Sequence, residues 1–61
     1  MSKLSEKELT CISESLAEEE LLVKKYQMLA NQANDSEICN KFQGIAQRHQ
    51  KHFNELYSLL G

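Results

Sequence analysis

The fold is decided by the stretch Ile45-Ala46-Gln47-Arg48-His49-Gln50-Lys51-His52-Phe53. Its apolar residues keep the spacing of a helix, and two histidines fall on the same side of that helix. The row that contains them alternates steps of four and three residues, which is typical of a helix packed along one seam. This row runs Ile38, Phe42, Ile45, His49, His52, Leu56 and Leu59. The spacing therefore predicts a helix whose buried side includes both histidines.

The first half of the chain contains a second row with the same alternation. It runs Leu9, Ile12, Leu16, Glu19, Val23, Tyr26, Ala30 and Ala33. Glu19 is the one carboxylate in this row, and it lies about as far before Asp35 as the two histidines lie after it. If a tight turn near Asp35 joins two helices, Glu19, His49 and His52 should meet at one level. Because an unpaired buried carboxylate costs several kcal/mol, the pattern predicts a polar network or a site at that level.

The chain reads as a single all-α domain, residues 1–61. It contains no proline and only two glycines, so it lacks the residues that usually separate strands and turns. We expect a first helix over about residues 6–32, a turn over about 33–35 and a second helix over about 36–60. These elements form an antiparallel two-helix hairpin.

Both expected helices begin with residues that favour a helix start. The Ser5 hydroxyl can accept a hydrogen bond from the first turn while Glu8 reaches back, which is a capping box. For the second helix, either Asp35 or Ser36 can serve as the cap. The start of each helix is therefore predicted more firmly than its end.

A hairpin of 61 residues leaves much of its apolar surface in contact with water. Each of its two helices buries only one face, so the hairpin has no interior that is closed on all sides. We therefore expect two copies to pair as a homodimer into a four-helix bundle. Leu21 and Met28 lie outside the predicted seam, and they either broaden the packed stripe or form a surface for further assembly.

The charge pattern argues against nucleic acid and membrane partners. The net charge is −2 at pH 7, and no cluster of basic residues is present to bind phosphates. The apolar runs are far shorter than the roughly 20 residues that span a bilayer. The N-terminal residues Met1-Ser2-Lys3 show no apolar signal region. The expected location is therefore the cytoplasm.

The two cysteines fall near opposite ends of the predicted hairpin. Cys11 and Cys39 are therefore too far apart to form a disulfide within one chain. Two interpretations remain open, namely two reduced thiols and cross-links between different chains.

The histidine spacing predicts candidate metal ligands. His49 and His52 project from one face of a helix, and Glu19 on the facing helix would complete a three-ligand half-site for a divalent ion such as zinc or iron. The alternative is a metal-free network in which Glu19 accepts hydrogen bonds from the histidines and Tyr26 is a further donor. Because no Ser, Cys or Lys nucleophile accompanies a seam base, no catalytic residue and no enzyme are expected.

At these residues the sequence resembles the rubrerythrin and ferritin-like group. That group has Glu-x6-Tyr on one helix and Glu-x-x-His on the next, which correspond here to Glu19-x6-Tyr26 and His49-x-x-His52. The chain is most similar to the short ferritin-like spore coat proteins, which are half of a ferritin-like bundle. The residues around the second motif also match, namely Phe42, Ile45-Ala46 and Phe53. The resemblance implies a homodimer in which each chain contributes one hairpin to a ferritin-like four-helix bundle.

The sequence departs from this group at His49, where the group has a glutamate that bridges two metals. Two glutamates and four histidines would leave about two positive charges uncompensated beside two divalent ions. This argues against oxygen chemistry and leaves one zinc ion, two weakly held ions or no metal. We therefore expect a small structural protein of spore coat type with a degenerate metal site, whose partners are itself and other coat proteins. The alternative is a metal-binding ferritin-like protein that uses Glu19, His49 and His52 from each chain.

Overall fold

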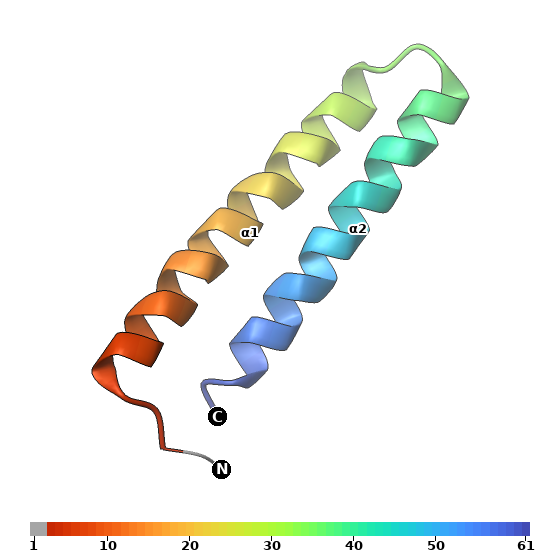
Figure 1. Ribbon diagram of the computed structural model, residues 1–61. Coiled ribbons are helices and arrows are strands. Elements are labelled where there is room, and N and C mark those ends of the chain that lie inside the picture. Colours follow the sequence, from red (N-terminus) through yellow and green to blue (C-terminus); the bar gives the residue numbers. More distant parts are fainter. Residues whose placement is uncertain (1–2) are drawn as a thin grey trace.

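The computed structural model describes residues 3–61, which form two antiparallel helices joined by a short turn (Figure 1). Helix α1 spans Glu6–Gln32 and helix α2 spans Ser36–Ser58. The prediction of an all-α hairpin is confirmed. Helix α2 ends before the expected limit at about 60, because the backbone N–H groups of Leu59 and Leu60 bond back only three residues. Residues 1 and 2, which belong to the predicted domain and to the N-terminal stretch read for a signal, lie outside the described residues.

Side chains cap both helices at their N-termini. The Glu8 backbone N–H donates to the Ser5 hydroxyl at 3.1 Å, and the Ser5 backbone N–H donates to Glu8 Oε1 at 2.8 Å. This is the predicted capping box. At α2 the backbone N–H of Ile38 donates to Asp35 Oδ1 at 3.0 Å. Asp35, rather than Ser36, is therefore the cap of the second helix.

Replacing Ser5 with alanine should lower the free energy of unfolding by about 1 kcal/mol, because the cap loses its acceptor. The hydrogen bonds from the Ser5 backbone and side chain lower the pKa of the Glu8 carboxyl below its ordinary value of 4.5. A lowered folded-state pKa stabilises the fold above that ordinary value, and the gain is lost as pH falls through the lowered one. Urea unfolding should therefore show a smaller difference between the parent and Ser5→Ala in acid than at neutral pH.

Ser13→Ala is the matched control, because Ser13 is exposed within α1 and is not a cap. Its stability should equal or exceed that of the parent at every pH. A deficit of Ser5→Ala that does not change with pH would show that Glu8 takes no part in the cap.

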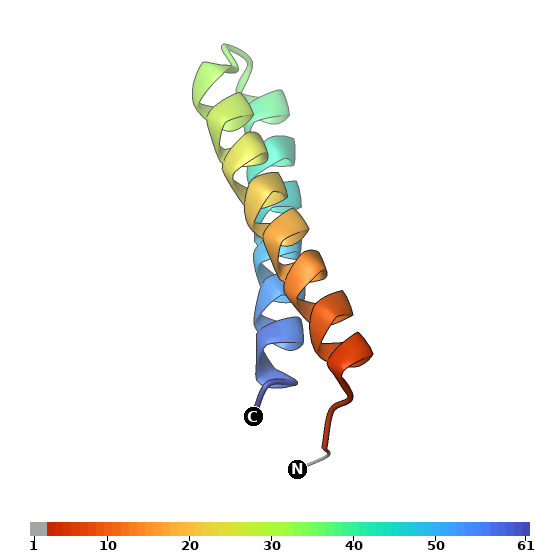
Figure 2. The same ribbon diagram turned by 90° about the vertical axis from the view of Figure 1, so that its left-hand side faces the viewer.

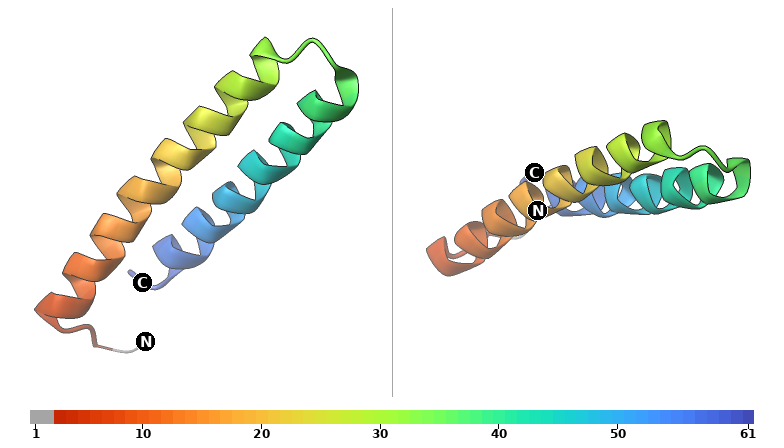
Figure 3. Two further views of the ribbon diagram at one scale, coloured as in Figure 1. Left: turned by 45° about the horizontal axis from the view of Figure 1, so that its top comes forward. Right: turned by 90° about the horizontal axis from the view of Figure 1, so that it is seen from above.

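The hairpin is a single layer of two helices. Its dimensions are 46 × 17 × 10 Å, and the smallest of these is about the diameter of one helix. The helices cross at a shallow angle, so the first turns of α1 diverge from the end of α2 (Figures 2 and 3). Among the described residues, the buried hydrophobic side chains are Ile12, Val23, Ala30 and Ala46. Both helices therefore keep a large apolar surface that the hairpin itself does not cover.

The face that α2 turns toward α1 differs from the predicted seam. Ala46 is buried, although it lies outside the predicted row, whereas Ile38, His52 and Leu59 of that row are exposed. The expectation that His52 lies on the buried side is therefore wrong. Apolar side chains occupy three neighbouring rows of α2, and α1 is only wide enough to cover two of them. The residues of the two covered rows are Cys39, Phe42, Ala46, His49, Phe53 and Leu56.

The uncovered row of α2 belongs to one broad side of the hairpin, which we call the front face. It contains Ile38, Ile45, His52 and Leu59, spaced seven residues apart, together with Leu22 and Leu29 of α1, which share the side of Glu19. Ile38 and Leu59 are 51% and 52% exposed. The opposite side, the back face, has shallow hollows whose polar lining consists of Glu20, Lys24, Gln27, Gln43, Gln47 and Gln50. The hairpin is therefore apolar on one side and polar on the other.

Three further expectations concern exposed residues and membranes. Leu21 and Met28 are exposed, so they do not broaden the packing between α1 and α2, and a role in further assembly stays a prediction. Cys11 is exposed and Cys39 is half-buried, and both are free thiols. Within residues 3–61, neither helix has the length and apolar character needed to cross a membrane.

Candidate functional site

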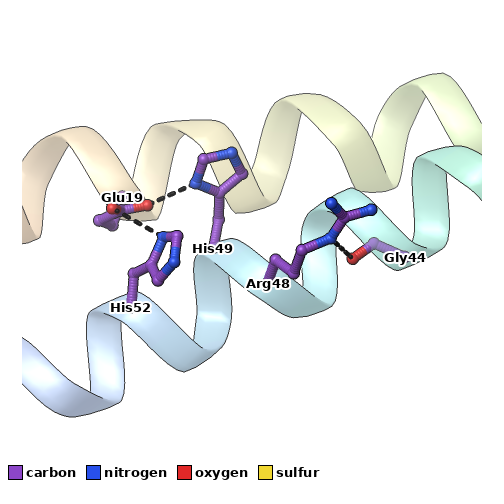
Figure 4. A network of polar contacts seen from close by, with 5 residues as sticks. All are labelled: Glu19, Gly44, Arg48, His49 and His52. Carbon is purple, nitrogen blue, oxygen red and sulfur yellow. Dashed lines mark hydrogen bonds and ion pairs between the residues drawn. The ribbon is translucent and has the colours of Figure 1, made fainter.

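Glu19 of α1 meets His49 and His52 of α2 midway along the hairpin (Figure 4). Glu19 Oε1 lies 2.6 Å from His49 Nδ1, and Glu19 Oε2 lies 3.4 Å from His52 Nδ1. The prediction that the three residues share one level is confirmed. Because an ionised carboxylate only accepts hydrogen bonds, the short contact requires that His49 Nδ1 carries the proton and donates it.

The two histidines are held to different degrees. The side chains of Glu19 and His49 are 18% and 23% exposed, and that of His52 is 51% exposed. The His49 ring stacks on Tyr26 with centroids 6.0 Å apart and an interplanar angle of 13°. The His52 ring meets the edge of His49 at 5.6 Å. His49 is therefore fixed by Glu19 and Tyr26 together, whereas His52 is open to the front face.

Tyr26 contacts the cluster in a different way from the one predicted. We expected its hydroxyl to be a further donor, but within the described part of the chain that hydroxyl bonds to neither Glu19 nor the histidines. Its ring instead lies between His49 and Phe42, whose centroid is 5.9 Å away. A tyrosine one helical turn beyond Glu19 projects past the carboxylate, so its ring rather than its oxygen reaches His49.

The cluster has the composition and size of a divalent metal half-site. One ligand atom from each of Glu19, His49 and His52 lies within 4.8 Å of the others. Around a tetrahedral zinc ion with bonds of about 2.0 Å, neighbouring ligand atoms are about 3.3 Å apart. Small side-chain movements would therefore bring all three residues around one ion.

A metal ion would have to replace the proton between Glu19 and His49. Their contact of 2.6 Å is a hydrogen-bond distance, shorter than the spacing of two ligands on one ion. Metal ligation needs the histidine nitrogen without its proton. The same three residues therefore support either a closed polar network or a metal site, and the two states exclude one another.

A shallow hollow opens beside the cluster on the front face. It is lined by Glu19, His52, Glu55, Leu56 and Leu59. The sequence reasoning missed Glu55, although its position three residues after His52 places it on a neighbouring side of the same helix. The cluster is therefore accessible from the front face, with an additional carboxylate at its edge.

Comparisons with known proteins found no match to a family model, to a curated protein or to a solved structure. The resemblance to ferritin-like spore coat proteins therefore stays a prediction. The functional conclusions below depend on the geometry of the hairpin and of its polar cluster.

Proposed function

We propose that the protein is a small structural helical protein in which two hairpins pair front face to front face as a homodimeric four-helix bundle. The observation that carries this proposal is the contrast between the two sides of the hairpin. The front face exposes Ile38 and Leu59, whereas the lining of the back face is rich in glutamine. Exposed apolar area of this kind marks a contact surface, and a second copy offers a matching one.

The thinness of the hairpin also supports pairing. A layer about one helix thick cannot enclose side chains from both sides, and Leu22, Leu29 and Ile45 are only half-buried in it. A second layer on the front face would remove these side chains from water, at a gain of about 25 cal/mol for each Å² of apolar surface covered. The back face gains little from a similar contact, because its side chains are polar.

The proposed setting is an assembly such as a spore coat. Its support is the sequence resemblance, which rests on Glu19-x6-Tyr26 and on His49-x-x-His52. In this reading the bundle is of ferritin-like form, its site is degenerate, and its further partners are other coat proteins. The protein would be made in the cytoplasm and then deposited in the coat.

Sedimentation equilibrium should show a dimer of the purified chain, and a charge on the front face should dissociate it. Ile38→Asp is the test variant, because Ile38 is exposed and its substitution should spare the hairpin itself. Gln43→Asp introduces the same charge on the back face and should leave the dimer intact. A fully helical monomer at every concentration, or equal effects of the two substitutions, would refute this pairing.

Metal binding is the second candidate function. The specific observation in its favour is that Glu19, His49 and His52 present ligand atoms within 4.8 Å of one another. Imidazole and carboxylate ligands suit zinc and iron among the divalent ions. Elemental analysis of protein purified without chelator tests it, and His52→Ala should lower any metal content that is found.

A further inference from the structure

We propose that one divalent cation, of the class of Zn²⁺, is shared between the two hairpins of the dimer and strengthens their pairing. This inference rests on the proposed pairing of front faces. It assigns to the cluster a regulatory role in assembly, in which the availability of metal sets how tightly two copies associate.

The first support is that the site of a single chain is incomplete. Glu19, His49 and His52 supply three ligand atoms, and structural zinc sites have four protein ligands. The open side of the cluster is the front face, where half of the His52 side chain is exposed. A second hairpin placed on that face is therefore the nearest source of further ligands.

The second support is the position of the cluster along the hairpin. Glu19 is the central residue of α1, which spans Glu6–Gln32. Pairing of identical faces about a two-fold axis brings the middle of one hairpin against the middle of the other, whichever ends the two turns occupy. The cluster of one chain should therefore face the cluster of its partner rather than an apolar part of it.

The third support is the charge of the paired clusters. With neutral imidazoles each cluster carries the single negative charge of Glu19, so two clusters carry two negative charges. One divalent cation neutralises them, whereas two cations would leave two positive charges beside Leu56 and Leu59, which line the same hollow. The expected stoichiometry is therefore one ion for every two chains.

Such an ion must couple to association. A ligand that binds the dimer but not the separate chains shifts the equilibrium toward the dimer by a factor that grows with its concentration. At a zinc concentration about 100 times its Kd for the dimer, the dissociation constant for pairing should fall by about 100-fold. A separate site in each hairpin would not produce this effect.

The test compares sedimentation equilibrium in Zn²⁺ with that in a chelator, together with the zinc content of the dialysed protein. We expect zinc to lower the dissociation constant for pairing at least about tenfold, with one zinc for every two chains. His52→Ala should abolish the zinc effect, and His52 is exposed enough that the hairpin should stay folded. Gln50→Ala, an exposed position of the same helix on the back face, should retain it.

The other outcomes separate the inference from the proposal beneath it. A dimer that forms equally in zinc and in chelator would overturn the shared ion and leave the pairing intact. Two zinc ions for each dimer, or one for each monomer, would also overturn it. A monomer under both conditions would remove the pairing and the inference together.

Discussion

Replacement of Phe42 by alanine is expected to lower the free energy of unfolding by about 3 kcal/mol. Phe42 lies in the covered rows of α2, and its ring packs against Tyr26 with centroids 5.9 Å apart. Fully buried phenylalanines lose about 3 to 5 kcal/mol on this substitution, and Phe42 belongs at the low end because it is half-buried. A chain of this length has a total stability of only about 3 to 9 kcal/mol. The variant should therefore be largely unfolded at room temperature.

Urea unfolding followed by circular dichroism measures this loss. If the hairpins pair, the unfolding midpoint of both proteins should rise with protein concentration, because the dimer is favoured by mass action. Leu21→Ala is the control, since Leu21 is 66% exposed on α1 and its truncation should cost far less. Equal losses for the two variants would place Phe42 outside the hydrophobic core.

A double-mutant cycle between Glu19 and His49 should give a coupling free energy of about 1.5 to 3 kcal/mol. Their hydrogen bond of 2.6 Å joins an ionised acceptor to a donor, and both side chains are mostly shielded from water. Bonds of this kind are stronger than those between neutral groups. The cycle uses Glu19→Ala, His49→Ala and the double variant, with unfolding measured in chelator so that no metal contributes.

The cycle between Glu19 and His52 is the matched comparison within the same cluster. That contact is 3.4 Å long, and the His52 side chain is half-exposed, so its coupling should stay below about 1 kcal/mol. Similar couplings for the two histidines would mean that they share the carboxylate equally in solution. A vanishing coupling for His49 would mean that the short hydrogen bond does not form.

The local features of the fold were predictable from sequence because they depend on neighbouring residues. The capping box of Ser5 and Glu8 and the limits of α1 follow from side chains within one turn of the helix end. The meeting of Glu19 with the two histidines was also predictable, because the short turn fixes which residues of the two helices lie at one level.

The rotation of α2 about its own axis was not predictable in the same way. Hydrophobic periodicity shows which residues avoid water, but not which neighbouring element covers each of them. Ala46 and His52 lie on adjacent apolar rows, and the structure places Ala46 against α1 and leaves His52 on the front face. If two copies pair as proposed, the sequence pattern describes the bundle of two chains, whereas the single hairpin shows only one of its contacts.

The same limit applies to the chemistry of the cluster. Spacing identified Glu19, His49 and His52 as neighbours, but it could not distinguish the two histidines. Their difference arises from depth, since one ring is stacked on Tyr26 and the other lies near the surface. Such differences of a few ångströms depend on helix rotation and are therefore visible only in the folded chain.

The short turn between α1 and α2 also orders the steps by which the chain folds. Contacts beside the turn, such as those of Ala30, close short loops, whereas those of Ile12 close loops of most of the chain. Because the entropy lost on loop closure grows with loop length, the hairpin should zip from the turn toward its open end. The divergence of the first turns of α1 from α2 lies at that open end (Figure 2). Those turns are the last to dock and the first to fray, with the Glu19 cluster as the midpoint of the zipper.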